Sequence, residues 1–123
     1  MVRIALGTTI YKICGRRAWD AALAAGIYEG SSDDARDGFI HFSTARQLPG
    51  TAQKHFCGRS DLVVAAFAAD ALGGALKWEA ARNGQMFPHL YGALDPATAL
   101  WVKPLDICDG AFRFAALDLE DGA

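Results

Sequence analysis

The chain has 123 residues, of which 52% are hydrophobic and 21% are charged. This size and composition support one hydrophobic core, which excludes a disordered protein and predicts a single domain over residues 1–123. The formal net charge of -2 supplies no field that would attract nucleic acid, so charge alone does not support a nucleic-acid partner.

The sequence shows neither a membrane segment nor a disulfide pattern. Its longest apolar run covers residues 62–69, which is too short to cross a bilayer, and the N-terminus lacks the apolar stretch of a signal peptide. Cys14, Cys57 and Cys108 are odd in number and show no paired spacing. We therefore expect a cytoplasmic protein with reduced thiols and no membrane partner.

The first third of the chain is predicted to form a strand, a helix and a loop. Alternation of apolar and polar residues predicts a strand over residues 8–13, which contains Lys12. Helical spacing of apolar residues predicts a helix over about 16–25, ended by Gly26. Residues 30–37 are rich in Ser, Asp, Ala and Arg and are predicted to be a polar loop.

The following segment, residues 37–44, combines a turn, a short strand and a helix start. Asp-Gly signals the turn, and strand alternation places His41 and Ser43 on one face. Thr44 and Gln47 have the spacing of a capping box, which predicts a second helix beginning after Thr44. The buried stripe predicted for that helix consists of Leu48, Ala52, His55 and Phe56.

The second half of the chain is predicted to consist mainly of short strands. The first of them is a continuous apolar run, which is typical of a central strand. Asn83-Gly84 predicts a hairpin turn between two of the strands. Pro104 is expected to stop a later strand. The predicted strands cover residues 61–68, 76–80, 86–91, 100–105 and 111–119. Two early helices followed by many short strands predict an α+β fold with a curved, mainly antiparallel sheet.

Two strands carry candidate functional side chains. His41 can serve as a general acid or base, or donate a hydrogen bond to a ligand hydroxyl or phosphate; the alternative is a buried histidine bonded to a main-chain carbonyl. His89 and Tyr91 share one face of a second strand, just after Pro88 fixes the backbone. The presence of His89 and Tyr91 on one face favours a functional site. The alternative is a structural turn in which both side chains form hydrogen bonds with nearby main chain.

Glu79 is a single carboxylate on a predicted strand. In a dry site it can orient a ribose hydroxyl or act as a base with a raised pKa; otherwise it faces water or pairs with Lys77 or Arg82. We expect no metal, because the cysteines and histidines lack a recognised zinc spacing. Gly73-Gly74 lacks the third glycine and the following helix of a dinucleotide-binding fingerprint, which argues against a Rossmann enzyme.

Several blocks in a fixed order resemble a small bacterial family known as domain of unknown function number 952. The blocks are the strand around Tyr11, the helix around Trp19, and residues 37–44, 47–51, 77–79 and 87–92. Members of this family are similar in fold to the ADP-ribosyltransferases, and particularly to the RNA 2'-phosphotransferases that consume NAD. The resemblance therefore implies an ADP-ribosylation-like fold with a split sheet.

The same resemblance implies NAD as a co-substrate and assigns roles to residues. Lys12 stands where relatives often have histidine and would meet a phosphate, and Glu79 would stabilise charge near the ribose 2'-hydroxyl. The implied catalytic residues are His41, Glu79 and His89, and the implied cofactor-binding residues are Lys12, His41, Ser43, Thr44 and Tyr91. The function implied is an NAD-dependent transferase acting on a nucleotide or phosphorylated acceptor. The alternative is a non-catalytic nucleotide- or ADP-ribose-binding module.

Overall fold

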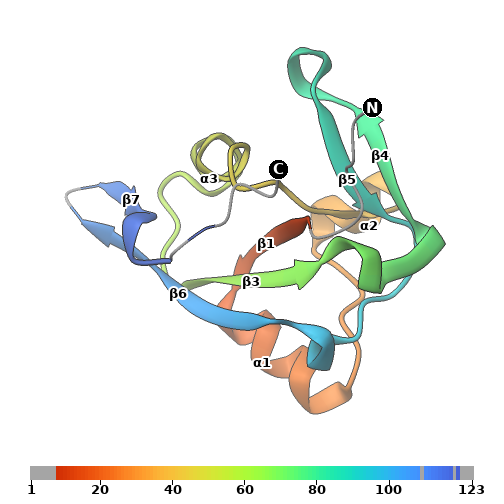
Figure 1. Cartoon of the computed structure of the whole chain (residues 1–123). Helices are drawn as coiled ribbons and strands as arrows, with labels where there is room; N and C mark the ends of the chain where they lie inside the picture. Colours follow the sequence, from red (N-terminus) through yellow and green to blue (C-terminus); the bar gives the residue numbers. More distant parts are fainter. Residues whose placement is uncertain (1–7, 109, 118, 120–123) are drawn as a thin grey trace.

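The computed structural model describes residues 8–108, 110–117 and 119, and its strands form two antiparallel sheets (Figure 1). The larger sheet has the order β1-β3-β6-β7, with β1 at Thr9–Gly15, β3 at Leu62–Ala68, β6 at Trp101–Cys108 and β7 at Ala111–Arg113. The smaller sheet has the order β2-β5-β4, with β2 at Ile40–His41, β5 at Met86–Leu90 and β4 at Leu76–Ala80.

The two sheets meet where β1 runs past the end of β2. The backbone N–H groups of Tyr11 and Ser43 each donate to the carbonyl of the other residue, at 2.8 and 2.9 Å. The strands thus form a curled antiparallel half-barrel with few helices. This confirms the α+β class and the curved, antiparallel sheet predicted from the sequence.

Within the described residues, three α-helices cover the sheets, namely α1 at Arg16–Ala25, α2 at Ser32–Asp37 and α3 at Leu48–Phe56. The prediction for α1 is confirmed, including its end at Gly26, whose φ of 79° suits glycine. Short 3-10 turns lie between later strands at Ala69–Ala75, Arg82–Gly84 and Pro96–Thr98, and another follows β7 at Ala115–Leu117. No helix in the described ranges is long and apolar enough to cross a membrane.

The core lies on both faces of β3, the central strand of the larger sheet. Val63 and Phe67 pack in one cluster with Trp19 of α1, whereas Val64 packs in a second cluster with Leu48 of α3. Figure 1 shows α1 and α3 on opposite sides of this sheet. Burial on both faces explains why β3 is a continuous apolar run rather than an alternating one.

The loop predicted for residues 30–37 is wrong, because most of this segment forms α2. The side chain of Ser31 accepts a hydrogen bond from the backbone N–H of Asp34, and the Asp34 carboxylate accepts one from the backbone N–H of Ser31. This reciprocal capping box satisfies N–H groups that the first turn of a helix leaves unpaired. It allows a polar, six-residue segment to begin a helix without an apolar stripe.

Two strand boundaries and the buried stripe of one helix also differ from the sequence prediction. Pro104 does not stop β6, because β7 pairs with β6 only from Asp106 to Cys108, and a proline without an N–H is tolerated where a strand has a free edge. The last predicted strand is shortened to β7. In α3, His55 is exposed, so the buried stripe consists of Leu48 and Ala52 with Phe56 partly buried.

Candidate functional site

His41 and His89 lie directly opposite each other on β2 and β5. Their ring centroids are 5.6 Å apart, and the Phe39 ring stacks on His89 with a centroid distance of 4.0 Å. Both histidines line a cleft of about 290 Å³ between the smaller sheet, α2 and α3. The cleft is also lined by Lys12, Ser31, Asp33, Asp34, Arg36, Asp37, Ser43, Thr51, Lys54 and His55.

Asp34 is the centre of the polar network on one wall of the cleft. Its side chain is only 2% exposed, yet it accepts hydrogen bonds from Lys12 Nζ at 2.9 and 3.1 Å and from the backbone N–H of His41 at 3.1 Å. Burial by itself would raise the pKa of Asp34. The bond with His41 and the charge and hydrogen bonds of Lys12 outweigh burial and hold this pKa well below its usual range.

His41 is held between two carboxylates. Its Nδ1 lies 2.6 Å from Asp34 Oδ1, and its Nε2 lies 2.9 Å from Asp37 Oδ2. A neutral imidazole has only one N–H, whereas the imidazolium has two. Both contacts are therefore satisfied together only when His41 carries a positive charge.

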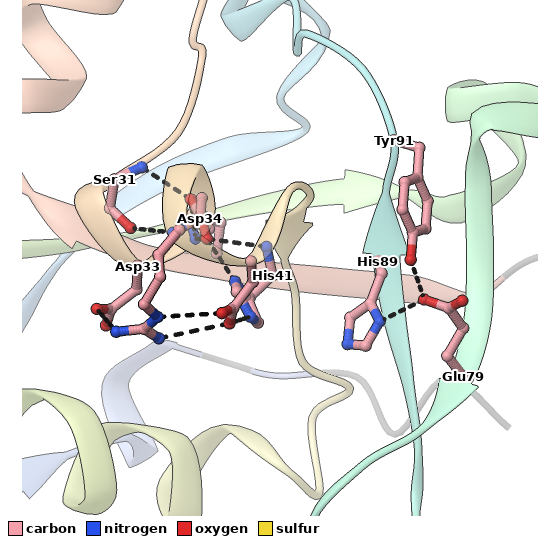
Figure 2. A network of polar contacts seen from close by, with 10 residues as sticks. Ser31, Asp33, Asp34, His41, Glu79, His89 and Tyr91 are labelled. Carbon is pink, nitrogen blue, oxygen red and sulfur yellow. Dashed lines mark hydrogen bonds and ion pairs between the residues drawn. The ribbon is translucent and has the colours of Figure 1, made fainter.

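His89 has the opposite arrangement, with one bonded nitrogen and one open nitrogen. Its Nδ1 lies 2.8 Å from Glu79 Oε1, and the hydroxyl of Tyr91 donates to the same oxygen at 2.8 Å. Figure 2 shows the other ring nitrogen of His89 pointing away from Glu79, toward the side on which His41 lies. A carboxylate that accepts from Nδ1 leaves the lone pair on Nε2, so this ring presents an acceptor to the cleft.

The Glu79 carboxylate is partly exposed and not in a dry site. Hydrogen bonds from His89 and Tyr91 lower the pKa of Glu79, in contrast to the raised pKa expected for a dry site. The same bond to Glu79 raises the pKa of the Tyr91 hydroxyl. Glu79 is therefore ionised at neutral pH and orients His89.

The structure brings together some of the predicted site residues and separates others. Lys12, His41, Ser43 and His89 line the cleft, whereas Glu79, Thr44 and Tyr91 are outside its described lining. The N–H and Oγ1 of Thr44 form the predicted capping box with Gln47. Gln47 directly precedes the first residue of α3. The hydroxyls of Ser43 and Thr51 are 2.8 Å apart in the cleft wall.

Sequence reasoning missed Asp34, which has the most hydrogen bonds in the site. The spacing Ser31-x-x-Asp34 is a capping-box pattern and was the available signal, although an aspartate is a less usual partner there than glutamate or glutamine. In the described part of the chain, no three His, Cys, Asp or Glu side chains gather in a way that could hold a metal ion.

The fold and the site define a small half-barrel protein with two opposed histidines in a cleft. The chain belongs to the family described as "Protein of unknown function (DUF952)", whose model matches residues 13–102. That range contains both histidines, Asp34 and Glu79.

Solved structures of one bacterial protein are similar to this chain. The crystal structure of protein CC0527 from Caulobacter crescentus is 46% identical, has a TM-score of 0.86, and the match covers 89% of this chain and 97% of that chain. The solution structure of the same protein is 45% identical, with a TM-score of 0.79 and coverage of 89% and 95%. No curated protein matches the chain.

Proposed function

We propose that the cleft binds a nucleotide or another phosphorylated small molecule and that His89 acts there as a general base. The observation that carries this proposal is the bond between His89 Nδ1 and Glu79, which leaves Nε2 as an acceptor in the cleft wall. A histidine with one nitrogen fixed by a carboxylate and the other open to a ligand is the usual arrangement of a histidine base.

The size and charge of the cleft support a phosphorylated ligand. Its volume of about 290 Å³ is close to the lower end of the usual range for small-molecule sites. Lys12 pairs with Asp34, and Arg36 pairs with Asp33, whereas Lys54 forms no ion pair with any described residue. Lys54, together with the positive His41, offers charge to a phosphate group.

The reaction that we propose is transfer of ADP-ribose from NAD to the bound acceptor. The bond between the nicotinamide nitrogen and the ribose breaks, and nicotinamide leaves with the electron pair. A hydroxyl oxygen of the acceptor forms the new bond to the ribose carbon, and its proton passes to Nε2 of His89. NAD comes from the resemblance to ADP-ribosyltransferases and from an ADP-ribosylation-like fold, which we propose for this half-barrel.

The family resemblance assigns contacts with NAD to Lys12, Glu79 and Tyr91, but the geometry around these three residues does not favour such contacts. The ammonium of Lys12 is bound by both oxygens of Asp34. Glu79 Oε1 is engaged by His89 and Tyr91, and neither Glu79 nor Tyr91 is in the described lining of the cleft. We therefore assign no contact with the nicotinamide or its ribose to these three residues.

The transferase proposal is tested by incubating the protein with NAD and RNA that bears a 2'-phosphate. We expect nicotinamide release that depends on the acceptor, and a loss of about 100- to 10,000-fold in rate for His89→Gln. Tyr91→Phe, which removes one bond to Glu79 and leaves His89 in place, is the matched control and should lose far less. If the wild type releases no nicotinamide and forms no ADP-ribosylated acceptor, this reaction is excluded.

A binding module without catalysis is the second candidate. The engaged state of Lys12 and of Glu79 favours it, because neither group is free to stabilise a transition state. Calorimetry with NAD, ADP-ribose and nucleoside monophosphates separates the two candidates. Binding of ADP-ribose without turnover of NAD would support the module and exclude the transferase.

A further inference from the structure

One carboxylate of the cleft lies where a ligand anion would bind. Asp37 Oδ1 accepts a hydrogen bond from Arg36 Nε at 3.1 Å, and Asp37 Oδ2 is bonded to His41 Nε2 at 2.9 Å. Arg36 Nη2 adds a weaker contact with Oδ2 at 3.4 Å. A guanidinium and an imidazolium thus surround one carboxylate, which is a typical arrangement for binding a planar or tetrahedral anion.

These donors belong to the cleft and are accessible. Arg36, Asp37 and His41 all line it, and the side chains of His41 and Asp37 are 35% and 34% exposed. The hydrogen bond and charge of Arg36, with a further contribution from His41, lower the pKa of Asp37, so the occupying group is a carboxylate at neutral pH.

We propose that Asp37 occupies the phosphate subsite of this cleft in the free protein, and that a phosphate group of the ligand displaces it from His41 and Arg36. This inference rests on the proposed binding of a phosphorylated ligand. It adds a specific subsite and an autoinhibitory contact that every ligand anion must break.

The exchange is favourable for a phosphate and inexpensive for the protein. A phosphate monoester carries more negative charge than a carboxylate and has three acceptor oxygens. Asp37 is the last residue of α2, followed by Gly38 at a φ of 87°, so its side chain can turn into water without loss of a helical turn. Asp34 stays bonded to Nδ1 of His41, and the incoming phosphate faces the same Nε2 that Asp37 had bonded, so both ring nitrogens again have an anionic partner.

The test compares the binding of inorganic phosphate and AMP to three forms of the full chain by calorimetry. Asp37→Asn keeps the shape of the side chain and removes its charge. Asp20→Asn is the matched control, because it removes the same charge from an exposed residue of α1 that is outside the described lining of the cleft. Thermal unfolding of each variant verifies that it is folded.

We expect both ligands to bind Asp37→Asn roughly fivefold or more tightly than the wild type, and Asp20→Asn to change affinity by less than about twofold. In the wild type, the carboxyl ¹³C signal of Asp37 should move toward that of a solvated aspartate when phosphate is added. Unchanged or weaker binding by Asp37→Asn, while AMP binds the wild type, would overturn the inference and leave the proposed function standing.

Two other outcomes separate the proposals further. If phosphate binds more tightly to Asp37→Asn but AMP binds no better than phosphate, the subsite stands and a nucleotide ligand is excluded. If neither ligand binds any form, both the subsite and the proposed function are wrong.

Discussion

Asp34 connects residues from three parts of the chain. It binds Lys12 of β1, His41 of β2 and the backbone of Ser31 before α2. The buried ammonium of Lys12 is therefore neutralised by one carboxylate, and the charge of His41 is supported by the same group. A buried charge that loses its partner is costly, because no water replaces the lost bond.

Asp34→Asn should consequently destabilise the fold by about 3–5 kcal/mol. The amide keeps the shape but leaves Lys12 without a counter-charge in a buried position. Asp33→Asn on the surface of the same helix is the control and should change stability by less than about 1 kcal/mol. Urea unfolding followed by circular dichroism measures both; equal stabilities for the two variants would contradict the role assigned to Asp34.

The lowered pKa of Asp34 also predicts how stability depends on pH. An unfolded aspartate takes up a proton near pH 3.9, whereas folded Asp34 stays ionised to lower pH, so acid favours the unfolded state. Its contribution is fully present above about pH 5 and is lost as pH falls below about 4. Urea midpoints from pH 6 to 3 should fall less steeply in Asp34→Asn; parallel curves would show that Asp34 titrates normally.

The hydrogen bond between His89 and Glu79 predicts the tautomer of His89. The neutral ring should carry its hydrogen on Nδ1, because Glu79 accepts there, and the lone pair should lie on Nε2. Long-range ¹⁵N spectra of ¹⁵N-labelled protein at pH 8 distinguish the two tautomers. A hydrogen on Nε2 in the wild type would remove the proposed base, and Tyr91→Phe should leave the tautomer unchanged.

At the scale of elements, α2 is the segment whose formation the cleft depends on most. It supplies Asp34 and Asp37, and it follows a close backbone approach at Gly30. A Cβ at Gly30 would lie 2.7 Å from the Cβ of Asp34, and the φ of Gly30 is 108°. Gly30 is therefore required both for its conformation and for the space that Asp34 occupies.

Gly30→Ala should destabilise the protein more than Gly26→Ala. A Cβ at Gly26 meets nothing within 4 Å, so only the left-handed conformation opposes the substitution, at about 1–2 kcal/mol. At Gly30 the contact with Asp34 adds at least about 1 kcal/mol more. Thermal unfolding of the two variants measures the difference, and equal losses would mean that Asp34 shifts freely.

Local patterns predicted the elements where periodicity was strong and failed where capping decided the structure. The apolar spacing before Gly26 predicted α1, and the apolar run of β3 predicted a central strand. The segment that forms α2 has no apolar stripe, and the reciprocal bonds of Ser31 and Asp34 start it instead. Composition therefore indicated a loop in the place where a helix presents the main carboxylates of the site.

At the scale of the molecule, pairing of distant strands creates the site. Strand alternation placed His41 and His89 each on a defined face. The register that sets them opposite each other joins β2 to β5, and the two histidines are 48 positions apart in the sequence (89 − 41). Such a register depends on long-range contacts that no local pattern contains. The pairing of Lys12 with Asp34 is non-local for the same reason.

The central claim is that a phosphorylated ligand binds between His41 and His89. The most direct test is a titration of ¹⁵N-labelled protein with AMP, followed by the amide and imidazole signals. We predict saturable shifts at His41, His89, Ser43 and Lys54, with Leu23 on the exposed surface of α1 unchanged. No shift at either histidine, or shifts confined to other surfaces, would contradict the claim.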